Sequence, residues 1–294
     1  MIKGIYTALI TPFTSENTID EKKFGDFIEW QIEEGVHGLV PCGTTGESPT
    51  LTHDEHNRVI ELCVEAAAGR AHIMAGTGSN STDEAIMTTQ HAKKVGADSV
   101  LVVAPYYNKP NQEGIYQHFK AINDAVEIPI IIYNVPSRSV VNISDDTIAR
   151  LAHLPNVVGV KDATGDLARP YLLRNKLKDL DKDFFMFSGE DMTAVAFNAS
   201  GGHGCISVSA NIVPSLCAKI QNKCFSGDYY SALELQDKLT ELNDAMFRET
   251  SPCPVKYAAS LIGKSSPYLR LPLVEVTETT KNEIKKILIN LDLL

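Results

Sequence analysis

NVVGVKDAT, residues 156–164, is a short apolar run that ends in a charged side chain. Its valines, bounded by a proline and a turn, predict a buried β-strand over residues 157–161, with Lys161 at the carboxyl end. Burial disfavours the ammonium form of a lysine, and the neutral amine is a nucleophile that can form an imine with a carbonyl compound. A lysine at a strand end can instead extend into water, so the rest of the chain must decide between these two roles.

Apolar runs like this one alternate with amphipathic segments along the chain. The predicted strands are residues 5–10, 38–41, 72–75, 99–104, 130–133, 157–161, 184–188 and 205–208. The helices predicted between them are residues 20–34, 52–68, 82–95, 112–125, 144–152, 172–177 and 192–199. Eight β-then-α units in one series favour an α/β fold of the closed (β/α)8 type, the TIM barrel, over a doubly wound sheet.

Only helices are expected after the eighth strand. Residues 232–246 carry apolar side chains at spacings of three and four, which is typical of one face of a helix. We therefore predict a barrel over residues 1–224 and a C-terminal helical segment, packed on the barrel, over residues 225–294.

Composition excludes several classes of function. The 294 residues carry a net charge of −10 without a basic run, which argues against a nucleic-acid or anionic-membrane surface. No apolar run approaches the roughly 20 residues of a membrane span, and no basic and apolar leader follows Met1. The six cysteines are scattered, which favours reduced thiols in the cytoplasm. Cys42 and Cys205 lie near predicted strand ends and receive no role.

The carboxyl ends of the strands are where the chemistry of such barrels is found. There the sequence places GTTGE (43–47), two tyrosines at 106 and 107, YNVPSR (133–138), Lys161 and SGE (188–190). This set suits imine chemistry: the lysine attacks a ketone, a tyrosine moves protons, hydroxyls relay them, and an arginine binds a carboxylate. Each of these residues alone is weak support, but together on one rim they favour the reactive role of Lys161.

Two other patterns were weighed for cofactor or metal binding. GTGSNS (76–81) lies between a strand and a helix but lacks the third glycine of a dinucleotide fingerprint, so we interpret it as a turn. His53 and His56 lie three residues apart without a further ligand cluster, so we expect solvated or ligand-contacting imidazoles. Neither a metal nor an organic cofactor is expected.

Five motifs in combination resemble one known family along nearly the whole chain. GTTGE (43–47), YNVPSR (133–138), GVKDATG (159–165), GGHG (201–204) and PVK (254–256) are similar to the dihydrodipicolinate synthase family. The resemblance implies a metal-free class I aldolase with a (β/α)8 barrel. It implies the condensation of pyruvate with L-aspartate 4-semialdehyde to 4-hydroxy-tetrahydrodipicolinate, the committed step of diaminopimelate and lysine biosynthesis. It also implies a homo-oligomer, commonly a dimer of dimers.

The resemblance implies four catalytic residues. Lys161 forms the imine with pyruvate, and Tyr133 is the general acid and base. Thr44 links Tyr133 to Tyr107 in a proton relay, and in the family this last tyrosine comes from the neighbouring subunit. The implied substrate-binding residues are Thr45 for the pyruvate carboxylate, Arg138 for the carboxylate of the second substrate, and Gly189 and Ile206, whose carbonyls line the site.

The resemblance further implies feedback inhibition by lysine at a separate allosteric site. Glu84 would pair with the α-ammonium of the ligand, and Asn80 and Tyr106 would bind its carboxylate. Acceptors for the side-chain ammonium would be Ser48, His53 and His56, provided that the imidazoles are neutral. Pro49 departs from the small residue usual in that loop of lysine-sensitive members.

Two alternatives to the synthase share part of this pattern. An N-acetylneuraminate or 2-keto-3-deoxy sugar-acid lyase shares the lysine, the tyrosine and a similar glycine-rich loop, but usually lacks an arginine at the position of Arg138. A non-catalytic small-molecule-binding barrel gives no reason to bring Lys161 and Tyr133 together. The synthase is therefore the favoured interpretation.

Overall fold

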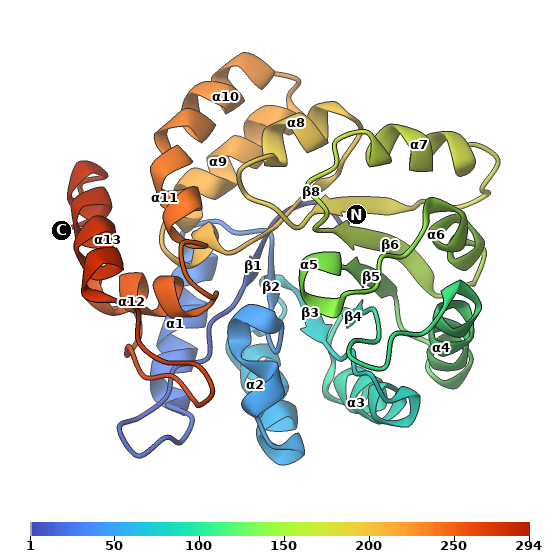
Figure 1. Ribbon diagram of the computed structural model, residues 1–294, viewed down its shortest axis with the longest axis horizontal. Coiled ribbons are helices and arrows are strands. Elements are labelled where there is room, and N and C mark those ends of the chain that lie inside the picture. Colours follow the sequence, from blue (N-terminus) through green and yellow to red (C-terminus); the bar gives the residue numbers. More distant parts are fainter. Residues whose placement is uncertain (1) are drawn as a thin grey trace.

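Eight parallel strands close into a barrel in sequence order, so the predicted (β/α)8 fold is confirmed (Figure 1). The computed structural model describes residues 2–294. The strands are β1 (Gly4–Ala8), β2 (Gly38–Val40), β3 (His72–Gly76), β4 (Ser99–Val103), β5 (Ile130–Asn134), β6 (Val157–Asp162), β7 (Phe185–Ser188) and β8 (Gly204–Ser207).

Helices surround the barrel and continue beyond it. Those of the barrel are α1 (Glu21–Glu33), α2 (His53–Ala67), α3 (Thr82–Val95), α4 (Gln112–Ala125), α5 (Pro136–Ser139), α6 (Asp145–Ala152), α7 (Arg169–Lys176), α8 (Ala194–Ala199) and α9 (Pro214–Phe225). The C-terminal helices are α10 (Tyr229–Lys238), α11 (Thr240–Ala245), α12 (Cys253–Leu261) and α13 (Glu278–Asn290). Figure 1 shows α11, α12 and α13 gathered on one side of the barrel. None of the helices in the described part of the chain is both long and apolar enough to cross a membrane.

Local signals in the sequence set several helix ends. Thr52 and Glu55 form a reciprocal capping box at the start of α2. Ser144 caps α6 by accepting a hydrogen bond from the backbone of Thr147. Gly96 ends α3 in the left-handed conformation, at φ +96°, which a glycine adopts without strain.

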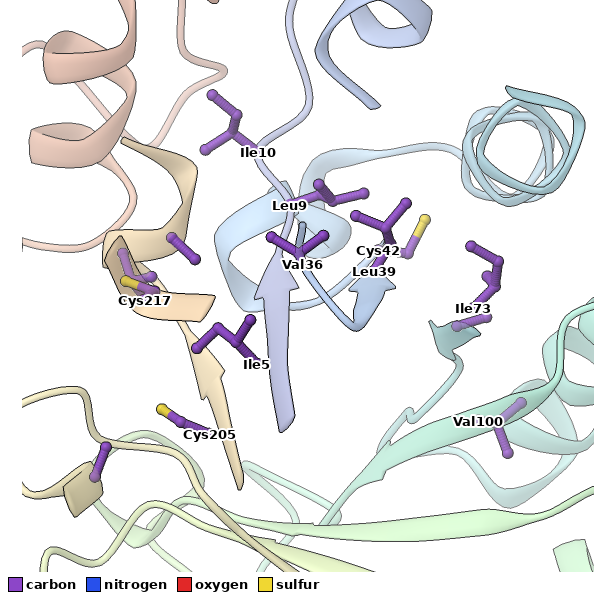
Figure 2. Close-up of a cluster of buried hydrophobic side chains, with 14 of the residues drawn as sticks. Ile5, Leu9, Ile10, Val36, Leu39, Cys42, Ile73, Val100, Cys205 and Cys217 are labelled. Carbon is purple, nitrogen blue, oxygen red and sulfur yellow. The ribbon is translucent and has the colours of Figure 1, made fainter. Parts of the chain in front are cut away.

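The hydrophobic core has two layers. The inner layer fills the barrel with side chains such as Tyr6, Met74, Ile131, Phe187 and Ile206. The outer layer packs the opposite faces of the strands against the helices, and Figure 2 shows part of it around β1, with Cys205 and Cys217 among aliphatic side chains. All six cysteines are buried free thiols, and burial raises the pKa of Cys42 and Cys205 well above the ordinary value.

Three features differ in detail from the sequence prediction. The apolar stripe of residues 232–246 spans α10 and α11, which are separate helices that meet at Leu239. Helix α7 begins at Arg169, ahead of the predicted residue 172, because Pro170 supplies a helix start. The single turn α5 was not predicted because four residues carry no periodic pattern.

Candidate active site

A cavity of about 670 Å³ opens at the carboxyl ends of β2 to β5. It is lined by polar side chains and by aliphatic ones such as Leu101 and Val135. Predicted site residues on its wall are Thr44, Ser48, His53, His56, Glu84, Tyr106, Tyr133 and Arg138. Two of the residues predicted for catalysis, Thr44 and Tyr133, therefore share one cavity with most of those predicted for lysine binding, whereas Lys161 and Tyr107 do not line it.

Lys161 and Tyr133 are paired neighbours on adjacent strands. They face each other in the register of β6 and β5, and the Lys161 Nζ lies 4.4 Å from the centre of the Tyr133 ring. The lysine side chain is buried, with 6% of its surface exposed, so it does not extend into water. The carboxylate of the adjacent Asp162 is held by the Arg169 guanidinium at 2.7 Å and by Thr164. The lysine amine therefore faces an aromatic ring rather than a fixed counter-ion.

Gly189 packs directly against the lysine side chain. A Cβ at this position would lie 2.9 Å from the Cε of Lys161 and 2.7 Å from the Cβ of Ala163, too close for either neighbour. The Gly189 amide donates to the carbonyl of Asp162 at 2.7 Å, which fixes the backbone there. Ile206 lies fully buried in the inner layer of the barrel. Both residues lie outside the wall of the 670 Å³ cavity.

The GTTGE loop after β2 is tightly held. Its two threonines lie in different environments: Thr44 lines the cavity, whereas Thr45 is buried and does not line it. The backbone is left-handed at Cys42 (φ +55°), just before the loop, and at Glu47 (φ +57°), its last residue, and each such non-glycine residue costs roughly 1 kcal/mol. Neighbouring groups must therefore hold the loop in place.

The two consecutive tyrosines after β4 point in different directions. Tyr106 lines the cavity, whereas Tyr107 is 91% exposed and has a left-handed backbone, at φ +68°. A side chain so exposed makes little contact within its own chain, so Tyr107 does not reach Thr44 of the same chain. The predicted relay is thus not assembled within a single chain.

The residues predicted for lysine binding surround Glu84 at the start of α3. The Glu84 carboxylate accepts a hydrogen bond from Ser79 and pairs with the His53 Nε2 at 3.2 Å. His56 is buried, and its Nδ1 has no hydrogen-bond partner within residues 2–294. Burial lowers the pKa of His56 to about 4, so its ring is neutral at pH 7. Asn80 lies outside the cavity wall, and its carbonyl accepts from Asn108.

Two contacts between the site and the C-terminal segment were not predicted from the sequence. Arg138 donates to the carbonyl of Ser251, in the C-terminal segment, at 3.2 Å. Glu47, the last residue of GTTGE, pairs with Lys256 of the PVK motif, 209 residues away. Both motifs were visible in the sequence, but nothing in a single sequence indicates that they touch. In the described range 2–294, no cluster of three or more His, Cys, Asp or Glu side chains could hold a metal ion.

Comparisons with known proteins agree on one family. The model of the dihydrodipicolinate synthetase family matches residues 1–291. The 4-hydroxy-tetrahydrodipicolinate synthase of Rhodospirillum centenum is 58% identical over the full length of both chains. The crystal structure of the chloride-inhibited dihydrodipicolinate synthase from Acinetobacter baumannii, complexed with pyruvate, matches with a TM-score of 0.96 at 42% identity over all of both chains. The synthase of Cyanidioschyzon merolae with lysine bound matches with a TM-score of 0.95 at 33% identity over 99% of each chain.

Proposed function

The chain belongs to the dihydrodipicolinate synthetase family, and we propose that it condenses pyruvate with L-aspartate 4-semialdehyde to 4-hydroxy-tetrahydrodipicolinate. The product lies on the route to diaminopimelate and lysine. The observation that carries this proposal is the buried pair of Lys161 and Tyr133 at the carboxyl ends of adjacent strands. We propose that the protein is a lyase of the cytoplasm.

The proposed reaction begins with imine formation. The Lys161 amine attacks the ketone carbon of pyruvate, and the resulting carbinolamine loses water as Tyr133 passes protons to and from its oxygen. Removal of a methyl proton then converts the imine to an enamine, whose carbon attacks the aldehyde of the second substrate. The protonated imine nitrogen accepts the electrons of the broken C–H bond and returns them in the attack on the aldehyde. The amino group of the semialdehyde then attacks the imine carbon, closes the ring and releases the Lys161 amine, so the sequence needs neither a metal nor an organic cofactor.

Substrate binding is assigned to groups around this pair. Thr45 and its backbone hold the pyruvate carboxylate, and the carbonyls of Gly189 and Ile206 complete the imine site. Arg138, which is exposed and lines the cavity, binds the carboxylate of the semialdehyde through its forked guanidinium. This role of Arg138 is supported by its position in the wall of the cavity that Tyr133 and Thr44 also line.

Assembly and regulation extend the proposal. Tyr107 is assigned to the active site of a neighbouring subunit, where it would meet Thr44 and complete the relay, so that a dimer is the smallest complete catalyst. A dimer of dimers is the proposed assembly. Lysine is the proposed inhibitor, bound at the end of the cavity formed by Ser48, His53, His56, Glu84 and Tyr106, with Asn80 beside it.

Trapping the imine tests the central assignment. Incubation with pyruvate and borohydride should add one lactyl group to the intact mass, and Lys161→Ala should abolish that adduct. Lys182→Ala is the control, because Lys182 bonds backbone carbonyls at the amino end of β6 and should leave trapping unchanged. An adduct that persists at another lysine in Lys161→Ala would refute the assignment. Turnover of N-acetylneuraminate, without condensation of semialdehyde, would assign the chain to the sugar-acid lyases.

A further inference from the structure

A buried ion pair lies beneath the loop that carries Thr44 and Thr45. The Glu47 carboxylate and the Lys256 ammonium lie 2.6 Å apart, and both side chains are 0% exposed. The Lys256 Nζ also donates to the carbonyl of Thr11 at 2.9 Å. The second carboxylate oxygen of Glu47 accepts from the backbone amide of Arg270 at 3.0 Å.

Stability alone gives no reason for this pair. Taking two charges out of water is costly, and an apolar pair of similar volume is often as stable or more so. What an ion pair adds is a fixed geometry, because a movement of either partner leaves both charges buried without the opposite charge that offsets their loss of water. The location of the pair therefore indicates what it holds in place.

The pair joins three segments that are distant in the sequence. Glu47 immediately follows the turn of Thr44 to Gly46 and holds a left-handed backbone, at φ +57°. Thr11 follows β1, and its hydroxyl donates to the carbonyl of Gly46 at 2.8 Å. Lys256 comes from α12 in the C-terminal segment. Thr11 thus binds both the loop and the lysine that anchors the loop.

Arg270 secures the far side of the same loop. Its guanidinium binds both oxygens of Glu55, each at 2.6 Å, and the carbonyl of Thr50 at 2.9 Å. Hydrogen bonding from Arg270 lowers the pKa of Glu55 to about 2, so the carboxylate stays charged at neutral pH. The C-terminal segment therefore holds the GTTGE loop and its continuation into α2 at two points.

We propose that Glu47 and Lys256 are positioning residues through which the C-terminal segment fixes Thr44 and Thr45 for pyruvate. The proposal rests on the proposed function and deepens it. Neither residue lines the cavity, so both act through the loop. A displacement of about 1 Å in a positioning group can cost on the order of a hundredfold in rate, so a loop released from this anchor should lose pyruvate binding and imine formation first.

A paired substitution separates positioning from folding. The double variant Glu47→Gln with Lys256→Met keeps the side-chain volumes and leaves no lone charge buried. We expect it to fold with a Tm close to that of the wild type, yet to show at least a tenfold lower kcat/KM for pyruvate and a slower borohydride trapping rate. The KM for the semialdehyde should change less, because Arg138 lies on the loop after β5 and is held by the Ser251 carbonyl, which neither substitution removes.

Lys182→Met is the matched control, since it also removes a lysine bonded to backbone carbonyls, but at the opposite end of the barrel. It should lower Tm without changing the pyruvate KM. A folded double variant with the pyruvate kinetics of the wild type would overturn the proposal. If the double variant does not fold, Glu47→Asp keeps the charge and shortens its reach; an unchanged pyruvate KM there would overturn it equally. Failure of the wild type to trap pyruvate would instead remove the proposed function.

Discussion

Lys161 is confined between the ring of Tyr133 and the bare backbone of Gly189. A methyl group at residue 189 would lie 2.9 Å from the Cε of the lysine, so Gly189→Ala should push the amine away from its reacting position. We expect the rate of pyruvate trapping to fall by at least about tenfold while the far-UV circular dichroism stays unchanged. The measurement is the borohydride trapping rate at saturating pyruvate.

Gly25→Ala is the matched control for this substitution. Gly25 lies within α1, and an added Cβ there meets nothing within 4 Å. Alanine favours a helix over glycine by up to about 1 kcal/mol, so this variant should be at least as stable as the wild type and trap pyruvate at the same rate. A wild-type trapping rate in Gly189→Ala would mean that the close approach of Gly189 does not position the lysine.

Individual residues differ in how far the sequence reveals their contacts. The pairing of Tyr133 with Lys161 follows from consecutive strands of a parallel barrel, because both residues end an apolar run. The contact of Glu47 with Lys256 does not follow, because α12 lies outside the repeating units that set the register. A buried polar pair of this kind leaves no periodic signal in a single sequence.

At the scale of elements, all eight strands were predictable and their bounds were correct to within a few residues. Parallel strands buried on both faces are short apolar runs between helices, which is a strong signal. The break between α10 and α11 was not predictable, because the apolar stripe continues across it without a proline or a glycine. Tertiary packing sets such a boundary.

The amino-terminal ends of α2 and α3 contribute His53, His56 and Glu84 to the proposed lysine site. Glu84 supplies the negative charge, and His56 supplies a buried neutral ring whose Nδ1 has no partner within the described residues. We expect Glu84→Ala and His56→Ala to raise the inhibition constant for lysine by about tenfold or more, since each removes one charged or charge-assisted contact. A lysine titration of the condensation assay measures this.

Asp83→Ala provides the control for Glu84→Ala, because it removes the same charge from the same helical turn at an exposed position. It should keep the lysine sensitivity of the wild type. A wild type that is indifferent to millimolar lysine would end the proposal of feedback inhibition. Inhibition that survives both Glu84→Ala and His56→Ala would place the lysine site elsewhere.

At the scale of the whole molecule, the C-terminal segment is more than an addition to the barrel. The sequence predicted helices packed on the outside, and α10 to α13 are present. Through Lys256 and Arg270, however, this segment also reaches the loop after β2. We therefore propose that residues 224 and 225 separate the barrel from the C-terminal helices, but that the two parts do not function independently.

The exposed Tyr107 makes the assembly itself testable. The residue is 91% exposed and its backbone is left-handed, which is uncommon for a bulky residue, and a neighbouring subunit would cover the ring. Tyr107→Phe keeps the ring but removes the phenolic hydroxyl, so we expect a folded protein with turnover reduced by about tenfold or more.

Mixing this variant with Lys161→Ala tests whether the tyrosine is shared between subunits. Lys161→Ala should be inactive in every subunit. After subunit exchange, a mixed dimer of the two variants contains one complete site, with an intact Lys161 and a Tyr107 lent by the partner. In an equimolar mixture half of the dimers are mixed, and one of the two sites in each is complete. The mixture should therefore regain up to about a quarter of wild-type activity. Activity that never exceeds the mean of the two separate variants, once mass spectrometry shows that subunits have exchanged, would place Tyr107 in its own chain's site or outside the relay.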